Sequence, residues 1–312
     1  MNNIHKIQAL QQNIERIIIG KPDVIRLAII TLFAEGHLLI EDVPGVGKTT
    51  LAHALAKSID CSFQRIQFTS DMLPADIIGV SIFNQQQGEF EFQPGPIFAH
   101  IILADEINRT TPKTQSSLLE AMNERQVSVD GITHRLKSPF MVVATQNPFE
   151  YHGTYPLPES QLDRFFMRIR IGYPTLDQEK TIMRAERSVV TLDHLRPVLS
   201  AQEVVDIQTR VDNVTIEETL QEYILAIVAK TRESQWIELG VSPRGTIALQ
   251  RAARTSALIA GRPYCTPDDI KSLVVPTLAH RLVPNVQTFH DAPAEDAENI
   301  LRDIVDSIPV PL

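Results

Sequence analysis

Residues 37–50 have the sequence HLLIEDVPGVGKTT. Its apolar beginning predicts a short strand, and Thr50 opens a strongly helix-forming run that continues to Lys57. Between strand and helix, Gly45 and Gly47 can turn backbone N–H groups inward around phosphate oxygens, and the N-terminus of the helix adds its dipole. Strand, glycine loop and helix in this order are typical of a phosphate-binding loop.

The two residues after the glycines complete this pattern. We expect Lys48 to reach the β and γ phosphates of ATP and Thr49 to coordinate Mg²⁺. One residue departs from it, because Asp42 stands where the eight-residue pattern has its first glycine. On the loop alone, an ordinary strand-to-helix turn stays open as the alternative. We assign these residues to nucleotide binding: Pro44, Gly45, Val46, Gly47, Lys48, Thr49 and Thr50, with Ile19 and Gly20 in addition.

A second element strengthens the nucleotide-binding interpretation. Residues 101–104 are wholly apolar, as expected for a parallel strand that is buried on both faces, and Asp105 and Glu106 follow directly. We expect Asp105 to hold Mg²⁺, usually through water, and Glu106 to polarise the water that attacks the γ phosphate. A solvated acidic strand end is the alternative, but four apolar residues leading into the acids favour a catalytic pair. The loop and the acids together predict ATP hydrolysis.

Alternating strands and helices predict an α/β fold with a parallel sheet between helices. Apolar periodicity and helix-start signals place the helices at residues 4–18, 22–34, 50–57 and from 112 onward. The strands are expected at residues 37–41, 63–68, 101–104, 140–145 and 168–171. Two β-hairpins are expected as insertions, at about 79–95 and about 126–137.

The last third of the chain predicts helices only. Ser200 and Glu203 form a capping box, and Ser242 and Thr266 each precede a proline at the start of a further helix. We therefore expect a core domain over residues 1–173, a linker over 174–200 and a helical domain over 201–312.

Composition excludes several classes of protein. The chain has 312 residues with 29 basic and 38 acidic side chains, and its net charge of −9 argues against a dedicated nucleic-acid binder. Cys61 and Cys265 are the two cysteines, so neither a disulfide framework nor a zinc site is expected. The sequence lacks the apolar stretch of a signal peptide and any apolar run of membrane-spanning length. We expect a cytoplasmic protein with no transmembrane segment.

A series of motifs over nearly the whole chain resembles the MoxR family of AAA+ ATPases. The resemblance implies a P-loop AAA+ core followed by a small all-α lid. Asp42 means that the strict loop pattern is not met. The matching segments are VPGVGKT (43–49), GPIF (95–98), DEINR (105–109), LLEAM (118–122), ATQNP (144–148), LPESQLDRF (157–165) and SPR (242–244).

The resemblance also implies roles for three polar residues. Asn147 matches sensor 1, whose amide hydrogen-bonds the γ phosphate or the attacking water. Arg164 matches the arginine finger, which reaches the γ phosphate of a neighbouring subunit and can raise kcat by about 10³ to 10⁵. Arg244 matches sensor 2 at the start of a lid helix, and whether it serves its own subunit or the next stays open.

Each of these roles has a simpler alternative. Asn147 could be a turn residue before a proline, Arg164 could form a structural ion pair with Asp163 or Glu159, and Arg244 could be a surface arginine. Arg109, just after the two acids, could support subunit contacts or could be a solvated loop arginine.

By the same resemblance, the hairpins at 79–95 and 126–137 are the helix-2 insert and the pre-sensor 1 hairpin, which in relatives face the central pore of a ring. Phe83, Phe90 and Phe92 alternate along the first hairpin. They could contact a partner, although aromatic residues alternating in a strand are more often packed.

The function that the resemblance implies is an ATPase that assembles into a homo-oligomeric ring, expected to be a hexamer, and remodels or matures protein complexes. The client would be a protein, with von Willebrand factor A-domain proteins as one candidate class. One alternative is a nucleic-acid motor of the helicase-related AAA+ branch, favoured by basic residues in the second hairpin and disfavoured by the net charge. The other is a nucleotide-gated scaffold with little turnover, which would not need Glu106, Asn147 and Arg164.

Overall fold

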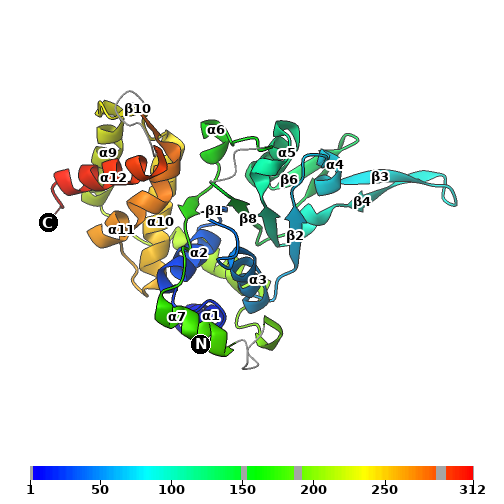
Figure 1. Cartoon of the computed structure of the whole chain (residues 1–312), viewed down its shortest axis with the longest axis horizontal. Helices are drawn as coiled ribbons and strands as arrows, with labels where there is room; N and C mark the ends of the chain where they lie inside the picture. Colours follow the sequence, from blue (N-terminus) through cyan, green and yellow to red (C-terminus); the bar gives the residue numbers. More distant parts are fainter. Residues whose placement is uncertain (1–2, 149–152, 186–191, 286–292, 312) are drawn as a thin grey trace.

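The computed structural model describes residues 3–148, 153–185, 192–285 and 293–311, which form an α/β core and a helical lid beside it (Figure 1). The core contains a five-stranded parallel sheet with the strand order β2-β5-β8-β1-β9. Its strands are β1 (Leu38–Glu41), β2 (Phe63–Gln67), β5 (Ile101–Asp105), β8 (Met141–Gln146) and β9 (Met167–Ile169). The prediction of an α/β core with a parallel sheet is confirmed.

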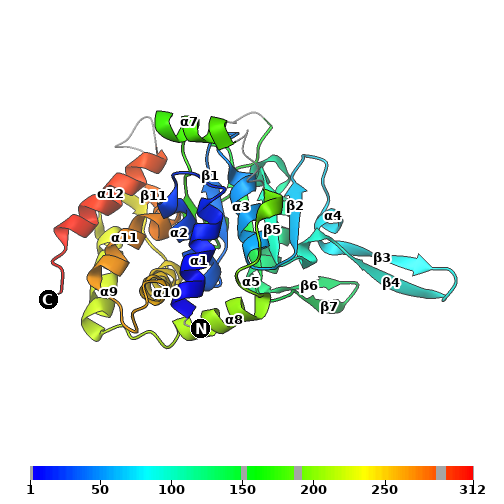
Figure 2. The same cartoon turned by 90° about the horizontal axis from the view of Figure 1, so that it is seen from below.

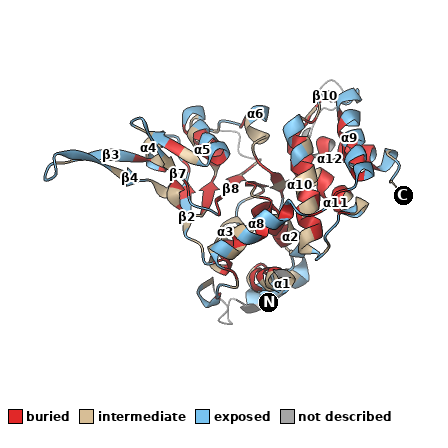
Figure 3. Ribbon diagram, turned by 180° about the vertical axis from the view of Figure 1, so that it is seen from behind, coloured by how far each residue is buried: buried red, intermediate tan, exposed pale blue. Residues whose placement is uncertain are grey.

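Helices cover both faces of this sheet because successive strand residues point to opposite sides. Leu38 and Ile40 pack into one hydrophobic cluster, and Leu39 packs into another. Figure 3 shows the sheet as the buried centre of the core. The first cluster includes residues of α1 (Asn3–Glu15), α2 (Pro22–Phe33) and α3 (Lys48–Ser58), and the second includes residues of α4 (Pro74–Ile78) and α5 (Pro112–Glu124).

Two antiparallel hairpins project from the core on the side away from the lid (Figures 1 and 2). They are β3 (Gly79–Asn84) with β4 (Glu89–Pro94), and β6 (Gln126–Val129) with β7 (Ile132–Arg135). Phe92 of the first hairpin stacks on His134 of the second, with ring centroids 4.0 Å apart. Phe83 and Phe90 are instead 50% and 72% exposed. Of the three phenylalanines, Phe92 therefore packs against the second hairpin, whereas Phe83 and Phe90 are exposed.

The lid is helical, as predicted, with one addition. Its helices are α8 (Ala201–Val211), α9 (Glu218–Glu233), α10 (Pro243–Ile259), α11 (Pro267–Leu278) and α12 (Pro293–Ser307). No strand was expected after residue 173, but β10 (Ile237–Leu239) pairs with β11 (Val283–Pro284). Strands of three and two residues are too short to show an alternating pattern, which explains why the sequence did not predict them.

Residues 174–200, expected as a linker, contain α7 (Leu176–Ala185) and the short helix η3 (Leu192–His194) in their described part. Gln178 of α7 donates to the carbonyl of Gly20 at 2.9 Å, and Asp193 of η3 pairs with Lys57 of α3 at 2.6 Å. This segment therefore contacts the core at both ends. Within the described ranges, we find no helix that is both long and apolar enough to cross a membrane.

Candidate nucleotide-binding site

The glycine loop opens into a pocket at the carboxyl edge of the sheet. β1, β5 and β8 are neighbouring parallel strands, so the residues that follow them meet at one edge. The residues that line this pocket are Pro44, Gly45, Gly47, Lys48, Thr49, Thr50, Arg65, Asp105, Glu106 and Asn147. The loop, the two acids and the proposed sensor residue, which lie far apart in the sequence, are thus brought together.

Three residues that we assigned to nucleotide binding lie outside the lining of this pocket. The Val46 side chain packs against the hydrophobic core. Gly20 lies between α1 and α2, where its carbonyl accepts the bond from Gln178 of α7. Ile19 precedes it and is half-buried. A nucleotide-binding role for these three residues stays a prediction.

Backbone conformation explains the two glycines of the loop. Gly45 and Gly47 have φ angles of +85° and +99°, in the left-handed region that side chains disfavour. A Cβ atom added to either residue would meet no other part of the protein within 4 Å, so steric crowding does not explain why these positions are glycine. The space beside the loop is open to a ligand, and the N-terminus of α3 begins at Lys48. This arrangement fits a phosphate chain.

Asp42 has a structural task that the loop pattern does not reveal. Its carboxylate is buried and accepts hydrogen bonds from the backbone N–H groups of Val43, Ile171 and Gly172 at 2.8, 2.7 and 2.6 Å. It therefore ties the entrance of the loop to the segment that follows β9. A glycine at this position could not make these bonds, which accounts for the departure from the pattern.

The Lys48 ammonium lies against the loop itself. It donates to the carbonyl of Asp42 at 2.6 Å and to that of Val43 at 3.2 Å. The loop carbonyls thus hold the positive charge of Lys48 at the pocket wall, next to the space that the glycines leave open.

Asp105 is the more tightly held of the two acids. Its Oδ1 accepts from the Thr145 hydroxyl at 2.6 Å, and its Oδ2 accepts from Nε and Nη2 of Arg65 at 3.1 and 2.7 Å. The Asp105 residue is only 7% exposed. A buried carboxylate requires such partners, and Arg65 supplies the compensating charge.

Glu106 follows Asp105 in the chain and lines the same pocket. Its backbone has a left-handed conformation, with φ of 59°. Its backbone N–H donates to the Thr145 hydroxyl at 2.8 Å. Its Oε2 accepts from Gln67 Nε2 at 2.7 Å and lies 3.0 Å from Arg109 Nε. Arg109 therefore contacts the acid beside it. Asn147 follows β8 directly, is 7% exposed and lines the same pocket as Glu106.

Sequence reasoning missed three residues at this site: Arg65, Gln67 and Thr145. Arg65 and Gln67 are two apart on β2 and both exposed, so they share one face of a strand that borders β5. Polar residues at positions 65 and 67 of one strand were the available signal. Thr145 is fully buried and follows four apolar residues of β8, and a hydroxyl at such a position requires a hydrogen-bond partner.

The two arginines with predicted roles lie at the opposite edge of the sheet. β9 enters the sheet with Met167 opposite Leu38, the first residue of β1, and Arg164 precedes β9 after the short helix α6 (Glu159–Leu162). Arg244 of α10 donates from Nη2 to Asn123 Oδ1 of α5 at 2.7 Å. Asn123 and Arg164 line one pocket, so the two arginines share this edge.

The alternative ion pair of Arg164 with Asp163 or Glu159 is absent among the described residues. Asp163 instead forms an ion pair with the buried Arg281 of the lid, which also donates to the carbonyls of Asp163 and Phe165 at 2.7 Å each. The Ser242 hydroxyl, at the start of α10, lies 3.2 Å from both carboxylate oxygens. The lid therefore holds the segment that carries Arg164.

The pocket offers groups for both the phosphates of ATP and Mg²⁺. Two glycines in the left-handed region leave room for phosphates, and Lys48 supplies a positive charge beside them. The Thr49 hydroxyl and the Asp105 carboxylate line the same pocket, and both are oxygen ligands of the kind that Mg²⁺ prefers. The residues present fit both groups.

Comparison with known proteins gives the family. A family model described as "ATPase family associated with various cellular activities (AAA)" matches residues 37–167, and an "AAA lid domain" model matches residues 229–304. Chaperone MoxR1 of Mycobacterium tuberculosis is 37% identical over 99% of this chain and 83% of its own length. The chain belongs to the MoxR family of AAA+ ATPases.

Two further relatives agree with MoxR-family membership. The Bacillus subtilis protein YeaC, described as uncharacterized, is 49% identical over 96% of this chain and 93% of its own length. A solved structure of a Cytophaga hutchinsonii protein matches with a TM-score of 0.90 and 37% identity, over 99% of this chain and 96% of that one. The predicted family, the AAA+ core and the lid are confirmed.

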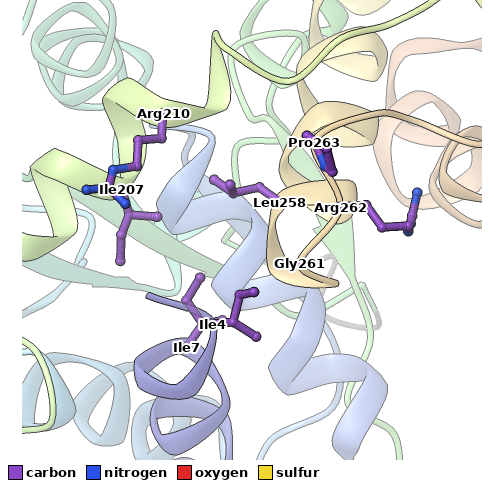
Figure 4. Close-up of a pocket in the computed structure, with 8 residues that line it drawn as sticks. All are labelled: Ile4, Ile7, Ile207, Arg210, Leu258, Gly261, Arg262 and Pro263. Carbon is purple, nitrogen blue, oxygen red and sulfur yellow. The ribbon is translucent and has the colours of Figure 1, made fainter. Parts of the chain in front are cut away.

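This MoxR-family chain has another pocket, between α1, α8 and the end of α10 (Figure 4). Mainly apolar side chains line it, and Arg262 at its rim pairs with Asp269 at 2.7 Å. No carboxylate is among its lining residues, so it offers no metal ligands of the kind found beside the glycine loop.

Proposed function

We propose that this protein binds ATP with Mg²⁺ and hydrolyses it in a homo-oligomeric ring, and that it uses the hydrolysis to remodel or mature a protein complex. One observation carries the hydrolytic part: the glycine loop, Asp105, Glu106 and Asn147 line a single pocket. A loop alone could bind phosphate, but the acids and the amide beside it are the groups that hydrolysis requires.

Each residue has a role in this proposal. The loop N–H groups and Lys48 bind the phosphates, and Thr49 and Asp105 hold Mg²⁺. The bound Mg²⁺ neutralises charge on the phosphate oxygens. Glu106 accepts a proton from water as the water oxygen bonds to the γ phosphorus and the bond to the β–γ bridging oxygen breaks. Asn147 orients that water or the γ phosphate, as sensor 1.

Arg164 and Arg244 would act on a neighbouring subunit. The strands β1, β5 and β8, which run from one sheet edge to the other, have four to six residues each. At about 3.3 Å per residue, the two edges are therefore roughly 15 Å apart. An arginine side chain does not span that distance to its own loop. A ring places this edge of one subunit against the nucleotide pocket of the next, so we assign both arginines to action in trans.

The protein-remodelling part rests on three observations. The relative from Mycobacterium tuberculosis is named a chaperone. The projecting hairpin exposes Phe83 and Phe90, which suits contact with protein more than with nucleic acid. The net charge of −9 supports the same choice. A hexameric ring and a von Willebrand factor A-domain client belong to this proposal.

The Glu106→Gln variant tests the hydrolytic part. We expect it to bind ATP with the affinity of the wild-type protein, because the loop is unchanged, while phosphate release falls at least about 100-fold for lack of a base. Binding is measured by fluorescence with a labelled ATP, and turnover by phosphate release. Hydrolysis at the wild-type rate would refute the role of Glu106. Absence of ATP binding in the wild-type protein would refute the proposed function as a whole.

A further inference from the structure

We propose that Arg65 is a built-in competitor of Mg²⁺ at Asp105. Its guanidinium neutralises the carboxylate before the metal binds, and it must give up this contact, in whole or part, when Mg²⁺ binds. The inference rests on the proposed nucleotide site and assigns to Arg65 a positioning role that sets how strongly nucleotide binding depends on Mg²⁺.

The geometry places the guanidinium at the metal ligand itself. Arg65 lies on the edge strand β2 opposite Leu103 of β5, two residues before the level of Asp105. Its Nε and Nη2 both point at the same carboxylate oxygen of Asp105, at 3.1 and 2.7 Å. Arg65 also lines the pocket that contains Thr49, the other proposed Mg²⁺ ligand.

Charge and coordination make this contact incompatible with an undisturbed metal site. Mg²⁺ requires a nearly octahedral set of oxygen atoms at about 2.0–2.1 Å and retains much of its water shell. One oxygen of Asp105 already accepts from Thr145, and the other accepts twice from Arg65. A positive guanidinium at that second oxygen opposes a divalent cation electrostatically. Lys48, which also lines this pocket, donates to the carbonyls of Asp42 and Val43.

Arg65 has a second partner that it can retain when Asp105 binds the metal. Its Nη2 donates to Gln67 Oε1 at 2.7 Å, and Gln67 Nε2 donates to Glu106 Oε2 at 2.7 Å. The side chain of Arg65 is 50% exposed, so it has room to move, whereas that of Asp105 is 10% exposed. The same hydrogen bonds connect the metal ligand to the proposed base.

A purely structural ion pair would predict something else. Half-exposed ion pairs contribute little to stability, and removal of such a pair would leave the Mg²⁺ dependence of nucleotide binding unchanged. Competition predicts that loss of the guanidinium weakens binding without Mg²⁺, because Asp105 then repels the phosphates. It also predicts that binding with Mg²⁺ stays equal or tightens.

The experiment measures the Kd of the full chain for a fluorescent, non-hydrolysable ATP analogue, once in EDTA and once in saturating Mg²⁺. For Arg65→Gln we expect the ratio of the two Kd values, EDTA over Mg²⁺, to rise roughly three- to tenfold above the wild-type ratio. Arg65→Lys keeps the positive charge on which the competition depends and should stay within about twofold of wild type. Gln64→Ala, on the other face of β2, is the matched control and should not change the ratio.

An unchanged ratio in Arg65→Gln, with the analogue still bound, would overturn the inference and leave the proposed function intact. Equal shifts in Arg65→Gln and Arg65→Lys would also overturn it, because charge would not be the cause. If the wild-type protein binds the analogue in neither condition, the proposed function itself fails.

Discussion

Asp42 shows at the scale of one residue how a departure from a motif can stabilise the site that the motif describes. A glycine at this position would free the loop entrance, whereas the buried carboxylate accepts three backbone N–H groups and links the loop to residues 171 and 172. Hydrogen bonds to a charged acceptor are stronger than neutral ones, and removal of the acceptor leaves buried donors without a partner.

We therefore expect Asp42→Gly, which restores the common loop pattern, to destabilise the core by about 3 kcal/mol. Asp42→Asn keeps one acceptor oxygen, so its stability should lie between those of the glycine variant and the wild-type protein. Urea unfolding followed by circular dichroism measures the difference. A glycine variant as stable as wild type would show that the three bonds are not needed.

His37 gives a prediction about pH. The ring is buried, its Nε2 bonds the carbonyl of Met122 at 3.0 Å, and its Nδ1 accepts from the N–H of Val142 at 3.0 Å. Its pKa is lowered to about 4, chiefly by burial; the Met122 bond opposes this shift, and the nearby Arg125 and Arg244 add to it. The neutral ring is therefore part of the fold.

Because the pKa of His37 is lower in the folded than in the unfolded protein, its contribution to stability is complete above pH 6.5. It is lost as the pH falls from 6.5 toward 4, by up to about 3 kcal/mol. In His37→Gln, the free energy of unfolding should fall less steeply over this range. Burial also lowers the pKa of His280, so His280 should account for part of the pH dependence that the variant keeps. Identical pH profiles for variant and wild type would contradict this assignment.

At the scale of elements, an ion pair and hydrogen bonds join the lid to the segment before β9. Arg281, from the short helix η4 (Ala279–Arg281), and Ser242, at the start of α10, both hold Asp163. Arg164 is the next residue, and Arg244 lies two residues after Ser242. Movement of the lid would therefore carry both arginines with it.

Asp163→Asn tests this link. It keeps the side-chain volume but loses the charge that Arg281 pairs with, so Arg164 should be held less firmly. We expect kcat for ATP hydrolysis to fall about tenfold with KM unchanged, because the nucleotide pocket lies at the other edge of the sheet. Glu159→Gln, at the start of α6 and four residues before Asp163, is the control and should keep the wild-type kcat. A parallel rise of KM would instead indicate a general loss of structure.

At the scale of the whole molecule, the groups that we propose as catalytic are divided between two edges of one sheet. Glu106 lies at the carboxyl edge and Arg164 at the other. A single chain with this arrangement cannot bring the two together, whereas a head-to-tail ring can.

Mixing of two inactive variants tests the ring. Glu106→Gln subunits offer an intact Arg164, and Arg164→Ala subunits offer an intact Glu106. After mixing in equal amounts we expect about a quarter of the wild-type rate, since half of the sites keep Glu106 and half of their neighbours keep Arg164. Phosphate release is the measurement, with each variant alone as the control. Mixtures no more active than their components would refute action in trans.

The sequence by itself determined the phosphate loop, the acids after the apolar strand and the order of core and lid. These are local features: Gly45, Gly47 and Lys48 are close in the chain, and the apolar run before Asp105 indicates burial without reference to any other strand. The sequence did not show that Phe83 is exposed and Phe92 packed, because this difference depends on which residues the other hairpin covers.

Only the tertiary structure decided which distant residues meet. Arg65 reaches Asp105, and Thr145 joins both acids, because β2, β5 and β8 lie side by side in the sheet. Strand order follows from how two faces of the sheet are covered by helices, which is a property of the packed core and not of any local pattern. For the same reason, the sequence could name Arg164 and Arg244 but not the edge that they share.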